Sequence, residues 1–320
     1  MNSLLIHDIR EQTFLHNRDN IARTLAYNHY FQQNPEIKWS LLAHIVSRNA
    51  GWNMTDLELP SFKTILTDPQ RKALFLTYES INWFIFRDAY PQLLIYERSK
   101  QQGKPLFFLF KYFGISTFME REWYRFYQTG DQDRLMIAQI INEQQLIQKP
   151  IVKHNPYQRK VFQRMPYYLQ SILHLNAVVI PTLCGKLYGL FIPPFQRVHN
   201  RIKIGKQLAQ LLYYPYLHPL FHDFINEVQV TGSREEYEQF MLNGPPHSAP
   251  PLRNVYERVE HELSESFSDW SYQTRIKNRW FKEPSLPNIQ LFHRDFMRKR
   301  HVLFEVGAVA STVKNVVKKR

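Results

Sequence analysis

The sequence predicts a mainly α-helical fold: one compact multi-helix domain rich in aromatic residues. Of the 320 residues, 44% are hydrophobic and 15% are aromatic, which is ample for a packed core and excludes the disordered class. Only 10 residues are glycine, too few for the tight turns of an all-β fold or for Gly-rich phosphate loops. Apolar residues recur at helical spacing in segment after segment, without convincing strand alternation or a helical repeat period, so no solenoid is expected.

Two helices are expected near the N-terminus. The first covers residues 17–34, has good helix starts in Asn17 and Asp19, and is closed by Pro35. The second covers residues 36–49 and is expected to stop at Ala50-Gly51, because Gly51 adopts the left-handed conformation freely. Arg48 in the last turn would then complement the negative end of the helix dipole.

Five later helices are expected from start signals and apolar spacing. Their expected first residues are Asp68, Ser116, Asp131, Ser233 and Arg253, and the last of them is expected to run to Phe267. The proline after Asp68 suits a first helical turn, whereas Pro91 either kinks that long helix or begins a new one.

One proline-rich stretch is the candidate domain boundary. Residues 243–251, NGPPHSAPP, contain four prolines and form either a stiff linker or a long surface loop. We therefore expect a main helical domain over 1–242 and a C-terminal helical region over 252–320 that packs on it. The last part of that region, 294–320, is a basic tail.

Three features predict a cytoplasmic protein. Cys184 is the only cysteine, so no internal disulfide can form, and its apolar neighbours favour a buried, inert thiol. The N-terminus lacks the basic and apolar regions of a signal peptide. Residues 177–195 are long enough to cross a bilayer, but the central Lys186 and three prolines favour a buried core segment.

The charge predicts anionic partners. The formal net charge is +13, which favours nucleic acid, phosphates or anionic lipid. Ten candidate anion-binding residues stand in two basic clusters: Arg197, Arg201, Lys203, Lys206, Arg298, Lys299, Arg300, Lys318, Lys319 and Arg320.

The two clusters favour different partners. The first is followed by Tyr213, Tyr214 and Tyr216, which suits stacking of single-stranded nucleic acid. The second belongs to the tail, where valines from 306 to 316 form the apolar stripe of an interfacial helix. We expect contact with an anionic membrane surface, peripherally at its inner face, more than contact with nucleic acid.

Residues 47–57, SRNAGWNMTDL, carry more hydrogen-bonding groups than a helix end requires. Polar residues of the preceding helix share one face at i, i+3, i+4, i+7 spacing, which predicts burial and hydrogen bonding. The candidate residues are Asn20, Arg23, Tyr27, His44, Arg48, Asn49, Asn53 and Asp56. They form either a structural network, with Arg48 held between the two helices by Asp19, Asp56 or helix-end carbonyls, or a ligand pocket. That pocket would be built on Arg23, His44, Arg48 and Asn53.

Two stretches carry a family resemblance. HNRDNIARTLAYNHYF (16–31) and PEIKWSLLAHIVSRNAGWNMTDL (35–57) resemble the uncharacterised YppC-like family of Bacillus and related Firmicutes proteins. The resemblance implies a cytoplasmic protein of a spore-forming bacterium and brings no catalytic residues with it.

Catalytic and metal motifs are weak. The sequence has no H-E-x-x-H, G-x-S-x-G, P-loop or dinucleotide fingerprint, and His218 with His222 lacks an evident third metal ligand. Glu79, His261 and Glu262 could act in acid–base chemistry but are otherwise ordinary helix residues. We expect no metal and no cofactor, and the absence of a strong catalytic motif favours a non-enzymatic role without excluding an enzyme. The expected function is binding or scaffolding near anionic lipid or polyanions, and the alternative is an enzyme or small-molecule binder at the polar cluster.

Overall fold

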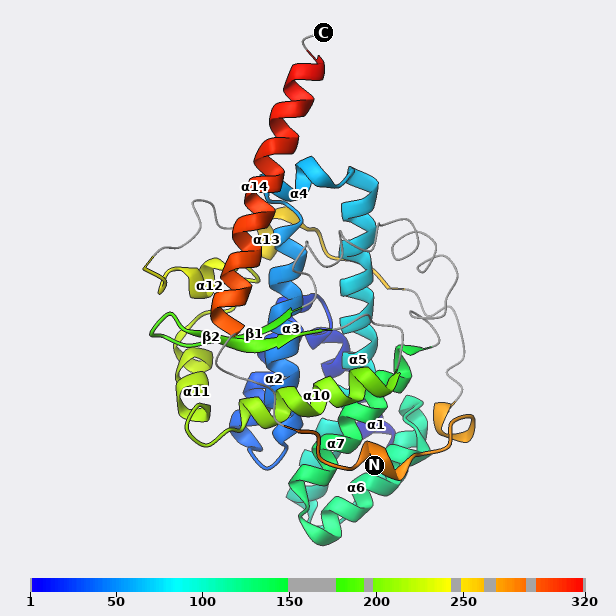
Figure 1. Ribbon diagram of the computed structural model, residues 1–320. Helices are drawn as coiled ribbons and strands as arrows, with labels where there is room; N and C mark the ends of the chain where they lie inside the picture. Colours follow the sequence, from blue (N-terminus) through cyan, green and yellow to red (C-terminus); the bar gives the residue numbers. More distant parts are fainter. Residues whose placement is uncertain are drawn as a thin grey trace.

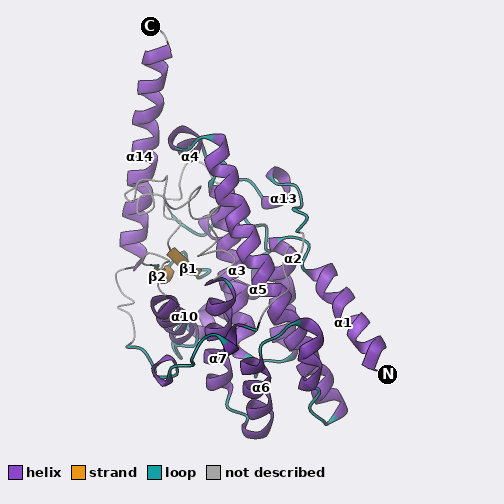
Figure 2. Ribbon diagram, turned by 90° about the vertical axis from the view of Figure 1, so that its right-hand side faces the viewer, coloured by secondary structure: helices purple, strands orange, loops and turns teal. Residues whose placement is uncertain are grey.

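Helices dominate the protein, and the predicted mainly α fold is confirmed. In the part of the chain that is described, the β structure is a single two-stranded antiparallel sheet. Figures 1 and 2 show the helices gathered around α3, with α14 extending beyond the body toward the C-terminus. The computed structural model describes residues 2–148, 177–192, 198–242, 249–261, 269–285 and 292–318.

The elements have the following bounds. The longer helices are α1 (Asn2–His16), α2 (Asn20–Gln33), α3 (Lys38–Asp56), α5 (Asp68–Gln102), α6 (Thr117–Thr129), α7 (Gln132–Leu146), α10 (Val198–Leu212), α11 (His218–Glu227) and α14 (Phe292–Lys318). The shorter ones are α4 (Pro60–Ile65), α12 (Glu235–Glu238), α13 (Leu252–Val255) and the 3-10 helices η1 (Phe107–Phe113), η4 (Trp270–Tyr272) and η5 (Asn278–Trp280). Strands β1 (Ala177–Pro181) and β2 (Leu187–Phe191) pair with Ala177 opposite Phe191.

Several helix starts are confirmed. The side chains of Asp19, Ser116 and Asp131 cap α2, α6 and α7 by accepting from backbone N–H groups three residues ahead. The N-cap of α5 is Thr67 rather than Asp68, because Thr67 forms a capping box with the side chain three residues on. Pro91 lies inside α5, which continues without a break to Gln102.

The second predicted helix ends later than expected. It continues through Ala50-Gly51 to Asp56, so Gly51 does not terminate α3 and Arg48 is not in its last turn. Gly51 serves close packing instead: a Cβ atom there would lie 2.6 Å from Asn20 Oδ1 and 3.2 Å from the Cα of Gly232. The glycine lets α2 and the turn at Gly232 approach α3, which is buried along nearly its whole length.

The segment tested for membrane spanning begins with the β-hairpin. β1 is buried, as expected of a core segment, but the chain there is extended rather than helical. None of the helices described is long and apolar enough to cross a membrane.

Cys184 lies exposed in the hairpin turn, so the expected burial of its thiol is wrong. A hydrogen bond with Thr182 is the main cause that lowers the Cys184 pKa.

The helix expected over 253–267 is wrong in its described part. α13 ends at Val255, and residues 256–261 are not helical. Tyr256 explains the change, since its ring stacks on Phe75 at 3.9 Å and its hydroxyl donates to the carbonyl oxygen of Met54 at 3.1 Å. These contacts hold the chain extended beside α3 and α5. The capping box expected at Ser233 precedes only the single turn of α12.

Aromatic residues fill the main core, as the composition predicted. Trp39 of α3, Phe86 of α5, Phe107 and Phe110 of η1, and Trp123 of α6 are all buried in one cluster. Burying each such ring contributes about 1.5–3 kcal/mol. The cluster therefore joins these helices into the rigid frame that carries the polar sites.

Candidate functional site

Short polar side chains join α2 to α3. Asn20 Nδ2 donates to the carbonyl oxygen of Ser47 at 2.8 Å, and the hydroxyls of Thr24 and Ser47 lie 2.7 Å apart. His44 Nδ1 donates to the carbonyl oxygen of Thr24 at 2.9 Å, because a carbonyl can only accept. Burial first, and then the charge of Arg48, lower the pKa of His44 to about 3, so the ring is neutral at pH 7.

Arg48 crosses to the segment that follows α11. Its Nε donates to Glu236 Oε2 at 2.6 Å, and its Nη2 donates to the carbonyl oxygen of Val228 at 2.8 Å. The other oxygen of Glu236 accepts from the backbone N–H groups of Thr231 and Gly232, each at 2.7 Å. Burial lowers the pKa of Arg48, and the Glu236 carboxylate opposes that shift. The pair is thus desolvated, and it is hydrogen-bonded through Arg48 Nε and Nη2, while Arg48 Nη1 has no partner among the described residues.

Asp56 and Asn53, at the end of α3, bind Arg234. Arg234 Nε donates to Asp56 Oδ2 at 2.6 Å, and Nη2 donates to Asn53 Oδ1 at 2.8 Å. The expectation that Asp19 or Asp56 accepts from Arg48 is therefore wrong. Arg48 was expected between the first two helices, but its partners come from a segment about 180 residues away, whose position the local spacing does not show.

A third arginine completes this set. Arg300 of α14 binds Glu238, and the Tyr237 hydroxyl accepts from both Arg234, at 2.9 Å, and Arg300, at 3.3 Å. Three guanidinium groups thus face three carboxylates with no excess charge. We call this set the polar seam: Arg48, Asn53, Asp56, Arg234, Glu236, Tyr237, Glu238 and Arg300.

Asn49 fixes the β-hairpin against α3. Its Nδ2 donates to the carbonyl oxygen of Val179 at 2.8 Å, and its Oδ1 accepts from the Val179 backbone N–H at 2.7 Å. Trp52, one turn on, packs edge to face with Tyr237 at 5.0 Å. The SRNAGWNMTDL stretch therefore binds β1 and the segment 228–238 from one helix.

The polar seam is closed to ligands of ordinary size. The cavity beside Asp56, Arg234 and Arg300 measures about 10 Å³, about the room for one water molecule. The side chains of His44 and Arg48 are completely buried. This geometry favours the structural network over the pocket on Arg23, His44, Arg48 and Asn53.

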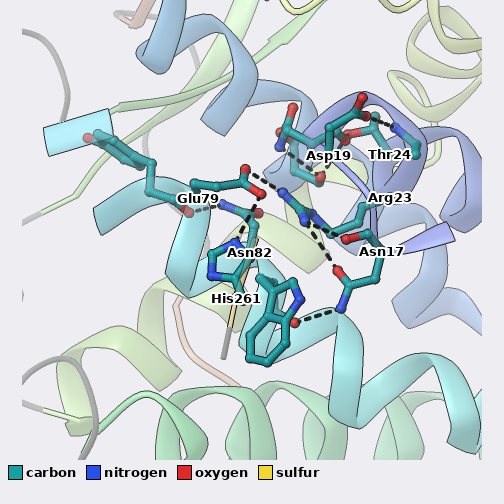
Figure 3. Close-up of polar contacts among 12 residues, drawn as sticks. Asn17, Asp19, Arg23, Thr24, Glu79, Asn82 and His261 are labelled. Atoms are coloured by element: carbon teal, nitrogen blue, oxygen red, sulfur yellow. Dashed lines mark hydrogen bonds and ion pairs between the residues drawn. The ribbon is translucent and has the colours of Figure 1, made fainter. Parts of the chain in front are cut away.

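Arg23 belongs to a separate ion pair (Figure 3). Its Nη2 donates to Glu79 Oε2 at 2.5 Å, and Glu79 Oε1 lies 3.5 Å from His261 Nε2. Burial alone would raise the pKa of Glu79, but Arg23 and then His261 outweigh it and hold the pKa below its usual value. His261 also stacks on Trp83 at 4.7 Å. The structure thus joins two acid–base candidates, and the ion pair and ring stack account for both.

A pocket of about 320 Å³ opens beside Glu79, between α5 and α13. Its polar wall includes Asp19, which binds Arg253 through both carboxylate oxygens at 2.9 and 3.1 Å. Tyr27, the remaining candidate of the α2 face, packs on Trp39 at 5.5 Å and has no hydrogen-bond partner among the described residues. No Ser, Thr, Cys, Lys or His side chain lines this pocket in the described residues.

Metal-ligand clusters do not occur in the described part of the chain. His218 and His222 both lie on α11, with ring centroids 6.1 Å apart. His218 Nδ1 contacts the carbonyl oxygen of Leu212 at 2.9 Å, and His222 pairs with Asn226.

Three predicted anion-binding residues are buried. Arg201 Nη2 donates to the carbonyl oxygen of Gln144 at 2.9 Å, and Arg300 lies in the polar seam. Lys206 donates to backbone carbonyl groups rather than facing solvent. These three cations hold the fold together and are not available to a surface ligand.

The other predicted residues divide between surface and undescribed positions. Lys203 is exposed on α10, and Arg298 lies on the surface of α14, 3.9 Å from Asp295. Lys299 Nζ lies 3.6 Å from the ring centroid of Phe191. Arg197, Lys319 and Arg320 lie outside the described residues, as do the side chains of Lys318 and of the valine stripe.

Side chains of α10 hold a distant segment alongside the helix. Lys206 Nζ donates to the carbonyl oxygens of Trp280 and Lys282 at 2.8 and 2.6 Å, and Gln207 Nε2 donates to that of Ser285 at 2.9 Å. Figure 1 shows this segment, in orange, near α6, α7 and α10. These hydrogen bonds place the basic run RIKNRWFK (275–282) beside the predicted basic helix.

The result is an electropositive face, defined by His199 and Lys203 of α10 with Lys277 and Arg279. All four are exposed, and the three Lys/Arg residues form no ion pair with any carboxylate that is described. Arg275 and Lys282 flank the face in sequence. α10 contains no acidic residue, and neither does the stretch 270–282.

Burial and the positive charges around His199 both lower its pKa. Burial is the largest cause that lowers its pKa, followed by the charges of Arg279, Lys206, Lys203 and Lys277. Lys277 and Arg279 were missed by the sequence analysis. The signal that could have found them is the run RIKNRWFK, with four basic residues in eight and no acid.

Comparisons with known proteins add relatives but no activity. A family model described as "Protein of unknown function (DUF2515)" matches residues 15–315. The chain is also similar to a protein of Bacillus subtilis (strain 168) described as "Uncharacterized protein YppC". The two are 45% identical over 305 residues, which cover 94% of this chain and 95% of the relative. No solved structure matches. The resemblance expected from residues 16–31 and 35–57 is confirmed.

Proposed function

The chain belongs to the DUF2515 family, and we propose that it is a binding protein for linear polyanions, which it contacts through the electropositive face. One observation carries the proposal. Hydrogen bonds from Lys206 join α10 to the segment 275–282, which lies about 75 residues away in the sequence. The basic side chains of the two segments therefore lie near each other, and no described carboxylate pairs with them. Unpaired like charges repel, so an anionic partner stabilises such an arrangement.

The physical basis is counterion release. A linear polyanion holds condensed cations, and each Lys or Arg that replaces one of them releases it into solution. Lys203, Lys277 and Arg279 are exposed and free of described carboxylates, so they can contact anionic groups without first breaking an ion pair. His199 adds a fourth charge when it is protonated, and a bound anion would favour that form.

Other surfaces support alternative partners less well. The basic tail stays a predicted site for an anionic membrane, since α14 extends beyond α4 but its side chains from residue 308 are not described. An enzyme or small-molecule site at Arg23, His44, Arg48 and Asn53 has less support, because these side chains are buried and hydrogen-bonded. A single cysteine cannot form an internal disulfide, which suits the reducing cytosol, so a cytoplasmic location stays part of the proposal.

The test neutralises the face. The triple variant Lys203→Gln/Lys277→Gln/Arg279→Gln should bind fluorescein-labelled inorganic polyphosphate at least about tenfold more weakly than wild type at low salt. The slope of log K against log salt should fall by about 0.7–0.9 for each cation removed. Fluorescence anisotropy over a salt series measures both quantities.

A matched control variant has the same net charge as the triple variant of the face. It removes three exposed cations outside the face, in the variant Arg18→Gln/Lys72→Gln/Lys104→Gln. This control should bind polyphosphate nearly as wild type does. The proposal is wrong if wild type binds no polyanion at about 50 mM salt, or if both triple variants lose affinity equally.

A further inference from the structure

A pocket adjoins the electropositive face. It measures about 500 Å³, within the range of about 300–1,000 Å³ that is common for small-molecule sites. It lies between the start of α6, α7 and the segment 271–281. The lining side chains that matter here are Arg121, Arg134, Ser271, Tyr272, Asn278 and Phe281.

One wall of the pocket is an arginine side chain packed on an aromatic ring. The Arg134 guanidinium lies 4.2 Å from the ring centroid of Phe281. It also donates to both carboxylate oxygens of Glu122, at 2.7 and 2.8 Å, which fixes its plane. The Arg134 side chain keeps 28% of its surface exposed. A guanidinium held flat in this way offers a surface on which a planar ring can stack.

A second planar surface faces solvent. Tyr272 lines the pocket with 77% of its surface exposed. An aromatic ring that gains so little from burial in the fold is available to a ligand. Asn278 lines the same pocket and supplies an amide group that can bond to the edge of a heterocyclic ring, whereas the Ser271 hydroxyl already donates to Asp269 Oδ1 at 2.7 Å.

The pocket and the electropositive face are continuous. Asn278 lines the pocket, while its immediate neighbours Lys277 and Arg279 belong to the face. A ligand that places one ring in the pocket can therefore place adjoining anionic groups on the face. A polymer that carries a planar ring and a phosphate in each repeating unit can bind in this way.

We propose that the pocket binds a base of single-stranded nucleic acid, stacked on Tyr272 and the Arg134 plane, while neighbouring phosphates lie on the electropositive face. This inference rests on the proposed function and names the class of polyanion. A single strand fits because its bases are free to leave the backbone and stack on protein side chains. Polyphosphate and lipid headgroups carry the charge but lack the ring that this pocket accommodates.

The test separates ring recognition from charge. Tyr272→Ala should weaken binding of labelled oligothymidine of about 20 nucleotides by about tenfold, the size expected from losing one base–aromatic stack. Tyr272→Trp should restore it. Neither change should alter the affinity for polyphosphate. Because Tyr272 is largely exposed, both variants should fold as wild type does.

The matched control is Tyr112→Ala, since Tyr112 is 47% exposed, lies outside the pocket and belongs to neither basic cluster. It should leave oligothymidine binding unchanged. If Tyr272→Ala binds oligothymidine as tightly as wild type does, the nucleic-acid inference fails while polyanion binding stands. An equal loss on phosphatidylglycerol vesicles would also overturn it, because Tyr272 would then enter a membrane interface. If wild type binds neither polymer, the proposed function itself fails.

Discussion

The polar seam and the electropositive face use the same residue types in opposite ways. In the seam, Arg48, Arg234 and Arg300 are buried, and each has a carboxylate partner. On the face, Lys277 and Arg279 are exposed, and no carboxylate among the described residues pairs with them. Burying a charge costs several kcal/mol unless a partner compensates it, whereas an exposed charge keeps its water.

This difference separates structural cations from binding cations. A buried, paired arginine is expensive to disturb, because its removal leaves a desolvated carboxylate behind. An exposed, unpaired cation contributes little to stability and is free to meet a ligand. Net charge alone does not distinguish the two, and three of the ten predicted anion-binding residues proved to be buried.

The largest expected effect is at Arg48. Arg48→Ala should lower the free energy of unfolding by about 3–5 kcal/mol, because it leaves Glu236 buried without its guanidinium. Arg48→Lys should also be costly, since a compact ammonium group does not reproduce the planar guanidinium that binds both Glu236 and the Val228 carbonyl. Urea denaturation of both variants measures the change.

Arg18→Ala provides the comparison for Arg48, since Arg18 is an exposed arginine without a described ion pair. It should change the unfolding free energy by less than about 0.5 kcal/mol. An Arg48→Ala variant as stable as Arg18→Ala would contradict the structural role of the seam.

A second effect, smaller over any single pH unit, should appear with pH at His44. Its pKa of about 3 in the folded protein lies below the usual 6.5, so its neutral form stabilises the fold above pH 6.5. That stability is lost as pH falls from 6.5 toward 3, by up to roughly 1.4 kcal/mol per pH unit. His44→Gln cannot take up this proton, so its unfolding free energy should depend less steeply on pH.

Urea denaturation over a pH series checks the His44 prediction. The control is His29→Gln, which removes an exposed histidine and should keep the slope of wild type. Equal slopes in His44→Gln and wild type would show that His44 does not hold its neutral form in the fold.

The smallest effect should come from the electropositive face. Lys203→Gln, Lys277→Gln and Arg279→Gln should each change the unfolding free energy by less than about 0.5 kcal/mol. Removing repulsion among these cations favours a slight gain. Urea denaturation of the triple variant tests this, and a loss as large as that of Arg48→Ala would remove the distinction between face and seam.

Local signals predicted local structure well. The caps at Asp19, Ser116 and Asp131 were predicted because a capping side chain binds a backbone group only a few residues away. The sequence predicts a helix end at Gly51, yet the role of this glycine depends on Asn20 and Gly232, which approach from other parts of the chain. Tyr256 ended the expected C-terminal helix for a similar reason, because Phe75 and Met54 hold it.

By itself, the sequence determined the helical class, the aromatic core, the polar richness of residues 47–57 and the excess of positive charge. These follow from composition and from contacts within a few turns. Only the tertiary structure decided that Arg48 meets Glu236, and that Lys277 and Arg279 meet the basic residues of α10. The physical reason is that desolvation and pairing depend on groups distant in sequence, so the role of each cation is set when the chain packs.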